Sequence, residues 1–316
     1  MESVRKTSLF RVRNCGKIRL MIKEVYAKTA FTATHDPDGW FGCRYNMNPY
    51  RGCEHRCIYC DSRSQCYGVE DFDHVVEAKV NLPELLRAEL IKKKHKGIMG
   101  FGAMSDPWTY AERKMGITRA CLEVLCEFSW PVHLTTKSDM CLRDLELIAE
   151  IAKRSYINIV FTLTTADDAL ASKIEPNAPL PSKRLEAMKI MADAGVKTGA
   201  LMTPVLPYIE DNKENIERVV QETAKAGGEF CIGYLGMTMR DRQRVYYYNK
   251  LDELFPGLRE KYEARYGESY SCHVPGGAGL YDFFKKICKD RGLVCEMGDF
   301  SYPYKKNKAG VQTSFI

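Results

Sequence analysis

The sequence contains no apolar run long enough to cross a bilayer. Its longest candidate, Phe230 to Met239, has ten residues, whereas a membrane-spanning helix needs about 18 or more. The first 25 residues also lack the apolar stretch of a secretory signal. Basic side chains recur there instead: Arg5, Lys6, Arg11, Arg13, Lys17 and Arg19. We therefore expect a cytoplasmic protein that does not insert into membranes.

The composition shows neither a strong charge of one sign nor the bias of a disordered chain. Of the 316 residues, 45% are hydrophobic and 28% are charged, which is typical of a globular protein with one large or two ordinary domains. Lys plus Arg is 47 and Asp plus Glu is 41, so the net charge is +6. Such a mild excess suits an anionic partner but does not by itself indicate nucleic-acid binding. No internal repeat or linker is evident.

Most of the 13 cysteines have no close partner in the sequence. Disulfides are not expected in a cytoplasmic chain, so the scattered thiols are interpreted as small buried hydrophobes. These are Cys15, Cys43, Cys121, Cys126, Cys141, Cys231, Cys272, Cys288 and Cys295. The exception is a C-x3-C-x2-C arrangement made by Cys53, Cys57 and Cys60.

This short loop can offer three thiolates to three irons of a cubane but cannot supply a fourth ligand. One iron is then left open for a chelating ligand such as S-adenosylmethionine. Two alternatives stay open. A zinc site could use Cys53, Cys57, Cys60 and Cys66, although zinc ligands usually come as two separated pairs. A thioredoxin-type pair could use Cys57 and Cys60, but the extra Cys53 argues against it.

Short β-like runs alternate with amphipathic helical runs after this loop. The pattern predicts an α/β fold in which six parallel strands, each followed by a helix, form a partial barrel. Asn81 and Ser182 are expected to cap two of the helices. Strands are expected at 45–50, 97–103, 131–136, 157–164, 197–203 and 229–235, and helices at 82–94, 117–128, 142–153, 183–194 and 212–226.

Three regions are expected on this pattern: an N-terminal segment (1–44), the partial barrel (45–236) and a C-terminal extension (237–316). The extension is predicted to be helical at 241–254, 258–266 and 279–291 and to end in a basic tail. Its segment Met237 to Tyr248 mixes arginines with tyrosines. This segment could hold phosphates and stack bases, or form an amphipathic helix with a solvated Arg face and a packed Tyr face.

Chemistry in βα barrels gathers where the strands end. The cysteine loop, Gly102 to Trp108, Thr135 to Cys141 and Thr164 to Asp167 all occupy such positions. On these residues the sequence resembles the radical SAM superfamily, and within it the branch of spore photoproduct lyase, often labelled DNA repair photolyase. The motifs that support this resemblance are the cysteine spacing, Asn46 to Gly52 before it and the GAMSDPW segment after it.

The resemblance implies that Cys53, Cys57 and Cys60 ligate a 4Fe-4S cluster. It also implies S-adenosylmethionine as cofactor and an electron donor such as flavodoxin or ferredoxin, with DNA as the first guess for the substrate. The cofactor-binding residues implied are Tyr59 at the adenosine, Ser105 and Asp106 at the methionine amino group, Lys137 at its carboxylate, and Thr165 near the ribose or carboxylate.

The chain departs from spore photoproduct lyase at two positions. Ala103 stands where that enzyme has a hydrogen-donating cysteine, and Asp61 stands where it has a tyrosine after the last cluster cysteine. Cys141 or Cys272 could then return a hydrogen atom to a carbon radical. An enzyme acting on RNA, a peptide or a small molecule is the alternative to a DNA lyase. A cluster or zinc protein without catalysis, binding nucleic acid or a partner, is the competing class.

Overall fold

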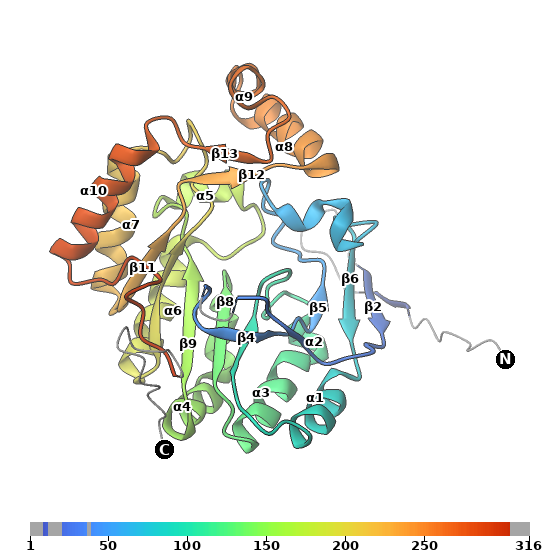
Figure 1. Ribbon diagram of the computed structural model, residues 1–316. Helices are drawn as coiled ribbons and strands as arrows, with labels where there is room; N and C mark the ends of the chain where they lie inside the picture. Colours follow the sequence, from blue (N-terminus) through green and yellow to red (C-terminus); the bar gives the residue numbers. More distant parts are fainter. Residues whose placement is uncertain (1–8, 12–20, 37–38, 304–316) are drawn as a thin grey trace.

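The computed structural model describes residues 9–11, 21–36 and 39–303. Its central feature is a seven-stranded sheet in the order β11-β10-β9-β8-β7-β4-β3. Six of these strands run parallel, in sequence order across the sheet, and only β3 (Thr32–Ala33) is antiparallel. The expected α/β partial barrel of six parallel strands is therefore confirmed (Figure 1). The six are β4 (Cys43–Asn46), β7 (Ile98–Phe101), β8 (Val132–Thr136), β9 (Ile157–Thr162), β10 (Lys197–Met202) and β11 (Phe230–Gly233).

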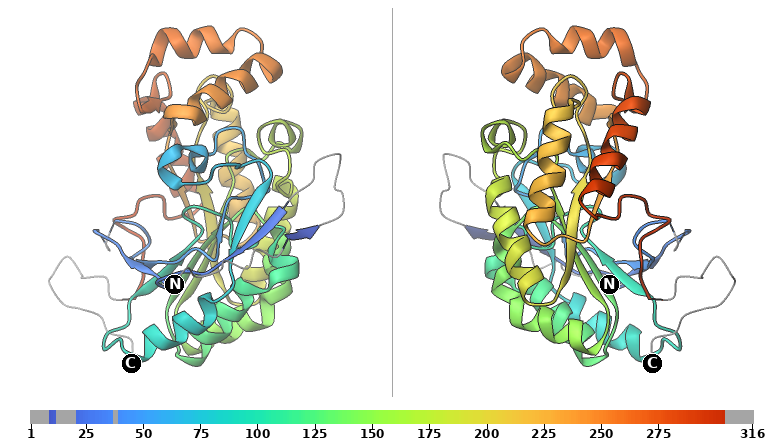
Figure 2. Two further views of the ribbon diagram at one scale, coloured as in Figure 1. Left: turned by 90° about the vertical axis from the view of Figure 1, so that its right-hand side faces the viewer. Right: turned by 90° about the vertical axis from the view of Figure 1, so that its left-hand side faces the viewer.

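Helices cover one face of this sheet (Figure 2). The longer helices bury an apolar stripe; in α3, for example, Cys121, Leu122 and Leu125 are fully buried. Neighbouring helices also contact one another, α1 with α3, α3 with α4, and α7 with α10. The helices are α1 (Leu82–Ile91), α2 (Glu112–Met115), α3 (Ile117–Glu127), α4 (Leu145–Arg154), α5 (Asp168–Ile174), α6 (Pro181–Asp193), α7 (Lys213–Lys225) and α10 (Gly277–Asp290).

The expected helix cap at Ser182 is wrong. Asn81 does occupy the N-cap position of α1, but its side chain makes no capping hydrogen bond. Its Oδ1 accepts a hydrogen bond from Ala27 N at 2.8 Å and its Nδ2 donates to Ala27 O at 3.0 Å, which ties the N-terminal segment to the barrel. Ser182 lies inside α6, where Pro181 occupies the first turn and suits it because proline needs no backbone hydrogen bond there. The Ser182 hydroxyl donates to Asp168 at 2.6 Å.

A second sheet, which the sequence pattern did not predict, is formed by strands that lie before and after the cysteine loop in the sequence. Its order is β1-β2-β6-β5, from β1 (Leu9–Arg11), β2 (Met21–Val25), β5 (Tyr50–Arg51) and β6 (Val75–Lys79). In β6 the buried residues alternate, with Val76 and Ala78 facing the core. Because β5 leads directly into Cys53, this sheet fixes the start of the cysteine loop.

The C-terminal part lies above the carboxyl ends of the parallel strands (Figure 1). Strands β12 (Gly236–Thr238) and β13 (Ser271–His273) pair antiparallel and bracket α8 (Asp241–Leu254) and α9 (Leu258–Tyr266). The described residues also form three short 3-10 helices, η1 (Asp61–Arg63), η2 (Gln65–Tyr67) and η3 (Asp139–Asp144). The predicted basic tail lies largely outside the described residues.

The two faces of the sheet bury different cores. Ile159 and Phe161 of β9 join the large core under the helices, whereas Val160 faces a smaller core with Phe41 and Phe230. This alternation follows from the two-residue period of a strand. Most scattered cysteines are buried as expected, Cys295 is half-buried, and Cys15 lies outside the described residues. Within the described part of the chain, no helix has both the length and the apolar character of a membrane span.

Candidate active site

A cavity of about 350 Å³ opens at the carboxyl ends of the parallel strands. Its wall brings together most of the residues singled out from the sequence: Cys53, Cys57, Tyr59, Cys60, Ser105, Asp106 and Lys137. Thr165 is buried and does not line the cavity; its hydroxyl accepts a hydrogen bond from Asp167 N at 3.0 Å. The site therefore collects side chains from the cysteine loop and from the ends of β7 and β8.

The three cysteines of the loop are free thiols on one wall of the cavity. Burial raises the pKa of Cys53 to about 12 and also raises the pKa of Cys60. Within the described residues, no three His, Cys, Asp or Glu side chains are grouped so as to hold a single metal ion. A cluster takes each thiolate on a different iron, so thiols spread along one wall fit that group.

The fourth cysteine of the zinc alternative does not join this set. Cys66 is exposed in η2, and its Sγ lies 3.3 Å from Ser64 Oγ and 3.5 Å from Arg240 Nη1. A thioredoxin-type pair of Cys57 and Cys60 would leave Cys53 without a role, although all three thiols line the same cavity. The three cysteines that the C-x3-C-x2-C spacing singles out thus share one cavity, and Cys66 does not line it.

Polar contacts with neighbouring segments hold the cysteine loop in place. The Ser105 hydroxyl donates to Gly52 O at 2.6 Å, just before Cys53. The Glu54 carboxylate accepts from Tyr110 N at 3.1 Å and Ala111 N at 3.0 Å. Asn177 Nδ2 donates to Glu54 O at 2.9 Å. These contacts leave the loop little freedom, so its thiols are presented in a fixed arrangement.

Asp106 organises the neighbouring strand ends. Its Oδ1 accepts from the Thr136 hydroxyl at 2.7 Å, and its Oδ2 accepts from Lys137 N at 2.7 Å. The His55 ring lies 3.6 Å from the same carboxylate, and burial lowers the pKa of His55, which favours its neutral form. Both oxygens of Asp106 are therefore engaged by the protein, although the side chain lines the cavity.

A buried ion pair that the sequence did not reveal supports Tyr59. The Tyr59 hydroxyl donates to Glu175, and the other oxygen of that carboxylate pairs with Arg184. Glu175 and Arg184 are almost fully buried. Burial opposes ionisation of Glu175, but Arg184 and Lys137 outweigh it and lower its pKa. Arg184 occupies the buried stripe of α6 with Ala187, Met188 and Met191, an unusual place for a charge and the one signal in the sequence that pointed to it.

Lys137 is a half-buried cation that lines the same cavity as the thiols. Its Nζ lies 5.6 Å from the centre of the Tyr59 ring. Burial lowers the pKa of Lys137, but the nearby Cys57 and Glu175 more than offset this and raise it. The side chain is thus held as an ammonium group at the cavity wall, where it can attract an anionic group.

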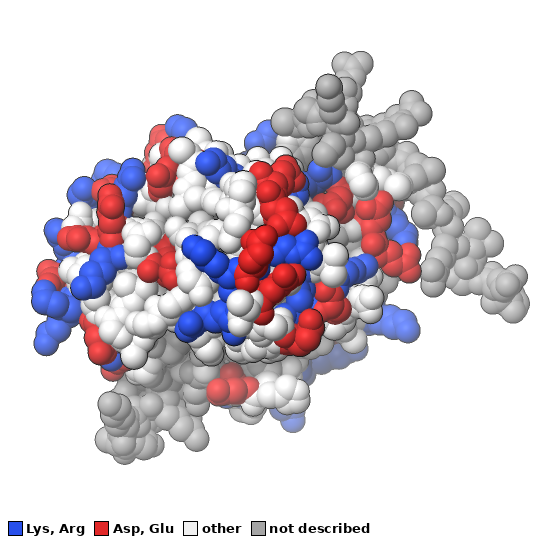
Figure 3. All heavy atoms as spheres, turned by 90° about the horizontal axis from the view of Figure 1, so that it is seen from above, with Lys and Arg blue, Asp and Glu red and all other residues white. Residues whose placement is uncertain are grey.

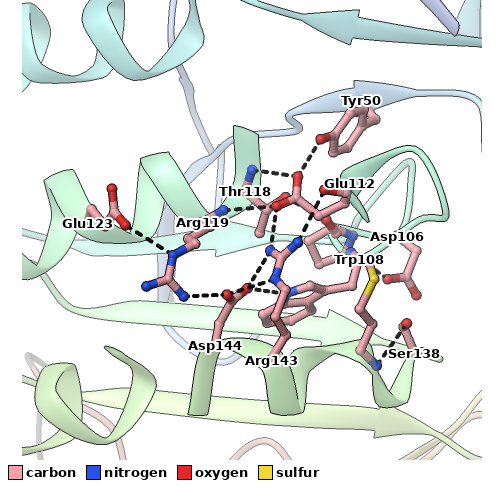
Figure 4. A network of polar contacts seen from close by, with 12 residues as sticks. Tyr50, Asp106, Trp108, Glu112, Thr118, Arg119, Glu123, Ser138, Arg143 and Asp144 are labelled. Carbon is pink, nitrogen blue, oxygen red and sulfur yellow. Dashed lines mark hydrogen bonds and ion pairs between the residues drawn. The ribbon is translucent and has the colours of Figure 1, made fainter. Parts of the chain in front are cut away.

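A network of buried charges fixes the segment that carries Ser105 and Asp106 (Figure 4). Trp108 Nε1 donates to Asp144 at 2.8 Å, and Arg143 bridges Asp144 and Glu112, each at 2.7 Å. Glu112 also accepts a hydrogen bond from the Tyr50 hydroxyl. The network joins β5, the segment after β7 and η3, which are the elements around the site.

The two residues at which the chain departs from spore photoproduct lyase both lie on the cavity wall. Ala103 and Asp61 both line the cavity. Asp61 Oδ2 accepts from the Tyr67 hydroxyl at 2.9 Å and from Arg240 Nη2 at 3.1 Å. A charged carboxylate held by two donors therefore stands directly after the last cysteine of the loop.

The two thiols suggested as hydrogen donors lie behind the cavity wall, and their role stays a prediction. Cys141 is fully buried in η3, close enough to Asp106 that this charge adds to the effect of burial in raising its pKa. Cys272 is fully buried in β13, where it pairs in register with Met237, a residue of the cavity wall. Neither thiol itself lines the cavity.

The arginines of the mixed Arg and Tyr segment are engaged within the protein. Arg242 donates to the carbonyls of Arg63 and Val69, and Arg244 is buried, donating to Met239 O and Ser269 O. Tyr247 and Tyr248 are buried as well. On the face seen from above, acidic and basic side chains are interspersed (Figure 3). The segment is a structural part of the C-terminal region more than a free phosphate-binding surface.

The fold is thus a partial βα barrel, and a three-cysteine loop lines a cavity at the ends of its strands. Residues 47–223 match the Radical SAM superfamily. The chain belongs to the radical SAM superfamily.

The chain is also similar to proteins of two other organisms and, in its fold, to solved structures. The chain is 31% identical over 208 residues to an uncharacterized protein of Methanocaldococcus jannaschii, covering 65% of this chain and 74% of that protein. It is 29% identical over 229 residues to an uncharacterized protein of Mycobacterium tuberculosis, covering 71% and 67%. The fold is similar to spore photoproduct lyase complexed with dinucleoside spore photoproduct, with a TM-score of 0.67, 15% identity and coverage of 87% and 81%. SuiB of Streptococcus suis bound to S-adenosylmethionine matches with a TM-score of 0.51, 14% identity and coverage of 79% and 49%.

Proposed function

We propose that the chain is a radical S-adenosylmethionine enzyme whose 4Fe-4S cluster is held by Cys53, Cys57 and Cys60. The observation that carries the proposal is the convergence of these three thiols, Tyr59 and Lys137 on one cavity at the strand ends. When bound, the cluster and S-adenosylmethionine would supply a 5'-deoxyadenosyl radical that abstracts hydrogen from carbon.

The residues of the chain have distinct parts in this proposal. Lys137, kept protonated by its anionic neighbours, would bind the methionine carboxylate. Tyr59, fixed by Glu175, would pack against the adenosine. Ser105 and Asp106 would place the cysteine loop and the strand ends around the methionine amino group, since both already bond to those segments. Thr165, which is buried beside the cavity and does not line it, would lie near the ribose or carboxylate of the cofactor.

Reconstitution tests the proposal. The protein is loaded anaerobically with iron and sulfide, reduced with dithionite in the presence of S-adenosylmethionine, and assayed for 5'-deoxyadenosine. We expect the product from the wild-type chain and none from the Cys57→Ala variant. Its absence from a wild-type chain that carries the cluster would reject the enzyme function and favour the competing class, a binding protein without catalysis.

DNA is the first proposed substrate, by likeness of fold to a lyase solved with a dinucleoside spore photoproduct. A lyase-like repair reaction would follow from it. Duplex and single-stranded DNA binding should be measured at several salt concentrations, because neutralised phosphates make affinity fall with salt. Binding that weakens strongly with salt supports a DNA substrate. If DNA does not bind, or if its binding does not change with salt, DNA is excluded as the substrate.

A substrate other than DNA is the second candidate, and three observations favour it. Ala103 and Asp61 replace the thiol and phenol of spore photoproduct lyase, and the arginines of α8 are engaged internally. RNA, a peptide or a small molecule would then occupy the cavity. Crosslinking at the mouth followed by identification of the captured molecule distinguishes these classes.

Hydrogen return by Cys141 or Cys272 is proposed for either substrate. Cys272 is the better placed, because its strand partner Met237 lines the cavity. Alanine variants of the two cysteines should be compared by yield of product per 5'-deoxyadenosine formed. A lower yield in one variant identifies that cysteine as the hydrogen donor. Unchanged yields in both variants would exclude both cysteines as donors.

A further inference from the structure

We propose that an exposed basic surface over the cysteine loop docks a small acidic one-electron donor protein of the flavodoxin or ferredoxin class. The proposal rests on the proposed function, because only a chain that works with a reduced cluster needs such a partner. We call it the Tyr110 surface and define it by five exposed residues: Tyr110, Arg113, Lys114, Lys173 and Asn177.

Glu54 holds the two segments of this surface against the loop. Tyr110 N and Ala111 N donate to the Glu54 carboxylate at 3.1 and 3.0 Å. From the other segment, Asn177 Nδ2 donates to Glu54 O at 2.9 Å. Glu54 directly follows Cys53, so both segments lie one residue away from a proposed cluster ligand.

The exposed charges of both segments are all basic. Between Tyr110 and Lys114 the only acid is Glu112, which is fully buried and pairs with Arg143 at 2.7 Å. Between Lys173 and Asn177 the only acid is Glu175, which is buried against Arg184. Two buried acids are thus neutralised from inside, while the side chains of Arg113 and Lys173 are exposed. Such a surface complements an acidic partner and speeds its encounter.

Tyr110 supplies an aromatic centre to this surface. Its side chain is 44% exposed, and the Arg113 guanidinium lies 5.2 Å from the centre of its ring. Tyr and Arg are the residues most enriched at protein interfaces. The route from Tyr110 N through the Glu54 side chain to Cys53 contains only covalent bonds and one hydrogen bond. An electron delivered at this surface therefore has a short bonded path to the proposed cluster.

The donor and the substrate would approach different sides of the loop. None of the five residues of the Tyr110 surface lines the cavity, whereas Cys53, Cys57 and Cys60 do. A donor protein bound at Tyr110 thus leaves the mouth free for substrate. Reduction at this surface would add one electron to the cluster and leave the chain's own residues unchanged.

Charge reversal tests the docking surface without relying on turnover. We would measure the dissociation constant of a purified, oxidised, acidic flavodoxin for the reconstituted protein by fluorescence anisotropy at low ionic strength. The Arg113→Glu/Lys173→Glu variant should bind about tenfold more weakly or worse, because like charges then face the partner. The control Lys94→Glu/Lys289→Glu reverses the same number of charges at exposed positions elsewhere. Its dissociation constant should stay within about twofold of the wild-type value.

A second measurement separates this proposal from the proposed function. With dithionite, which needs no docking, both variants should form 5'-deoxyadenosine at the wild-type rate. Wild-type flavodoxin affinity in Arg113→Glu/Lys173→Glu, or an equal loss in both variants, would overturn the Tyr110 surface. Absence of 5'-deoxyadenosine with dithionite in the wild-type chain would instead reject the proposed function. The milder Arg113→Gln/Lys173→Gln variant should lose less affinity than the reversal.

Discussion

The hydroxyl of Tyr59 donates a hydrogen bond to Glu175, 116 residues further along the chain. This contact joins the cysteine loop to the segment between α5 and α6. Through Glu175 it also joins the loop to Arg184, so a residue proposed to pack against the adenosine is held by a buried ion pair. The position of Tyr59 and the stability of the fold therefore depend on the same carboxylate, that of Glu175.

The first prediction concerns that ion pair. Glu175→Gln leaves Arg184 buried without its counter-charge and should destabilise the protein by about 3–5 kcal/mol. Tyr59→Phe removes a single hydrogen bond to a charged group and should cost about 1.5–3 kcal/mol. Urea unfolding measures both. Asp193→Asn, which breaks the exposed Lys189–Asp193 pair, is the control and should change little. Equal effects of Glu175→Gln and Asp193→Asn would contradict the account.

The second prediction concerns Glu210, another fully buried acid near the site. Its Oε2 accepts from Leu206 N at 2.9 Å, and burial raises its pKa from 4.5 to about 8. Because the folded state holds this proton more tightly than the unfolded state, the contribution of Glu210 is fully present below pH 4.5 and is lost as the pH rises toward 8. Glu210→Gln should therefore flatten the fall in unfolding free energy across this range. Identical pH profiles for variant and wild type would show that Glu210 does not titrate there.

The third prediction separates the cluster ligands from Cys66. Alanine at Cys53, Cys57 or Cys60 should abolish the brown chromophore and the bound iron and sulfide, because each thiolate is proposed to bind a different iron. Cys66→Ala should keep both, since that thiol contacts Ser64 and Arg240 instead. Iron and sulfide analysis after anaerobic reconstitution is the measurement. A loss of iron in Cys66→Ala would return the zinc-type ligand set to consideration.

The fourth prediction concerns the charge network beside the site. Asp144 accepts from Trp108, Arg119 and Arg143, so Asp144→Asn removes the charge that balances two arginines. We expect a loss of about 3 kcal/mol in unfolding free energy and weaker S-adenosylmethionine binding, because Trp108 follows Ser105 and Asp106. Glu123→Gln breaks only the outer contact with Arg119 and serves as the control. Wild-type stability in Asp144→Asn would show that the network is dispensable.

The parts of the fold with a strong local pattern were predictable from the sequence. Helices α8 and α9 have the predicted bounds, and the six parallel strands occur in the predicted order. Other elements carry little local signal. Strands β2 and β6 are short and far apart in the sequence, and they pair only because the fold brings them together. Helix α5 is too short for an apolar period to stand out, and no helix was expected between the strand at 157–164 and the helix at 183–194.

The candidate site shows the same division. Its cysteines and strand-end residues were found because motif spacing and strand position are local properties. Glu175 and Arg184 were missed because their roles arise from burial and pairing. The arginines of α8 could be interpreted two ways from sequence, and the structure resolves this for Arg242, which donates to the backbone carbonyls of Val69 and Glu70, about 170 positions away.

The most direct test of the central claim is electron paramagnetic resonance of the reconstituted protein, reduced with dithionite, with and without S-adenosylmethionine. If Cys53, Cys57 and Cys60 hold a 4Fe-4S cluster with one open iron, a reduced-cluster signal should appear and should change when S-adenosylmethionine is added. A signal that S-adenosylmethionine leaves unchanged, or a chain that takes up one zinc ion in place of iron and sulfide, would contradict it.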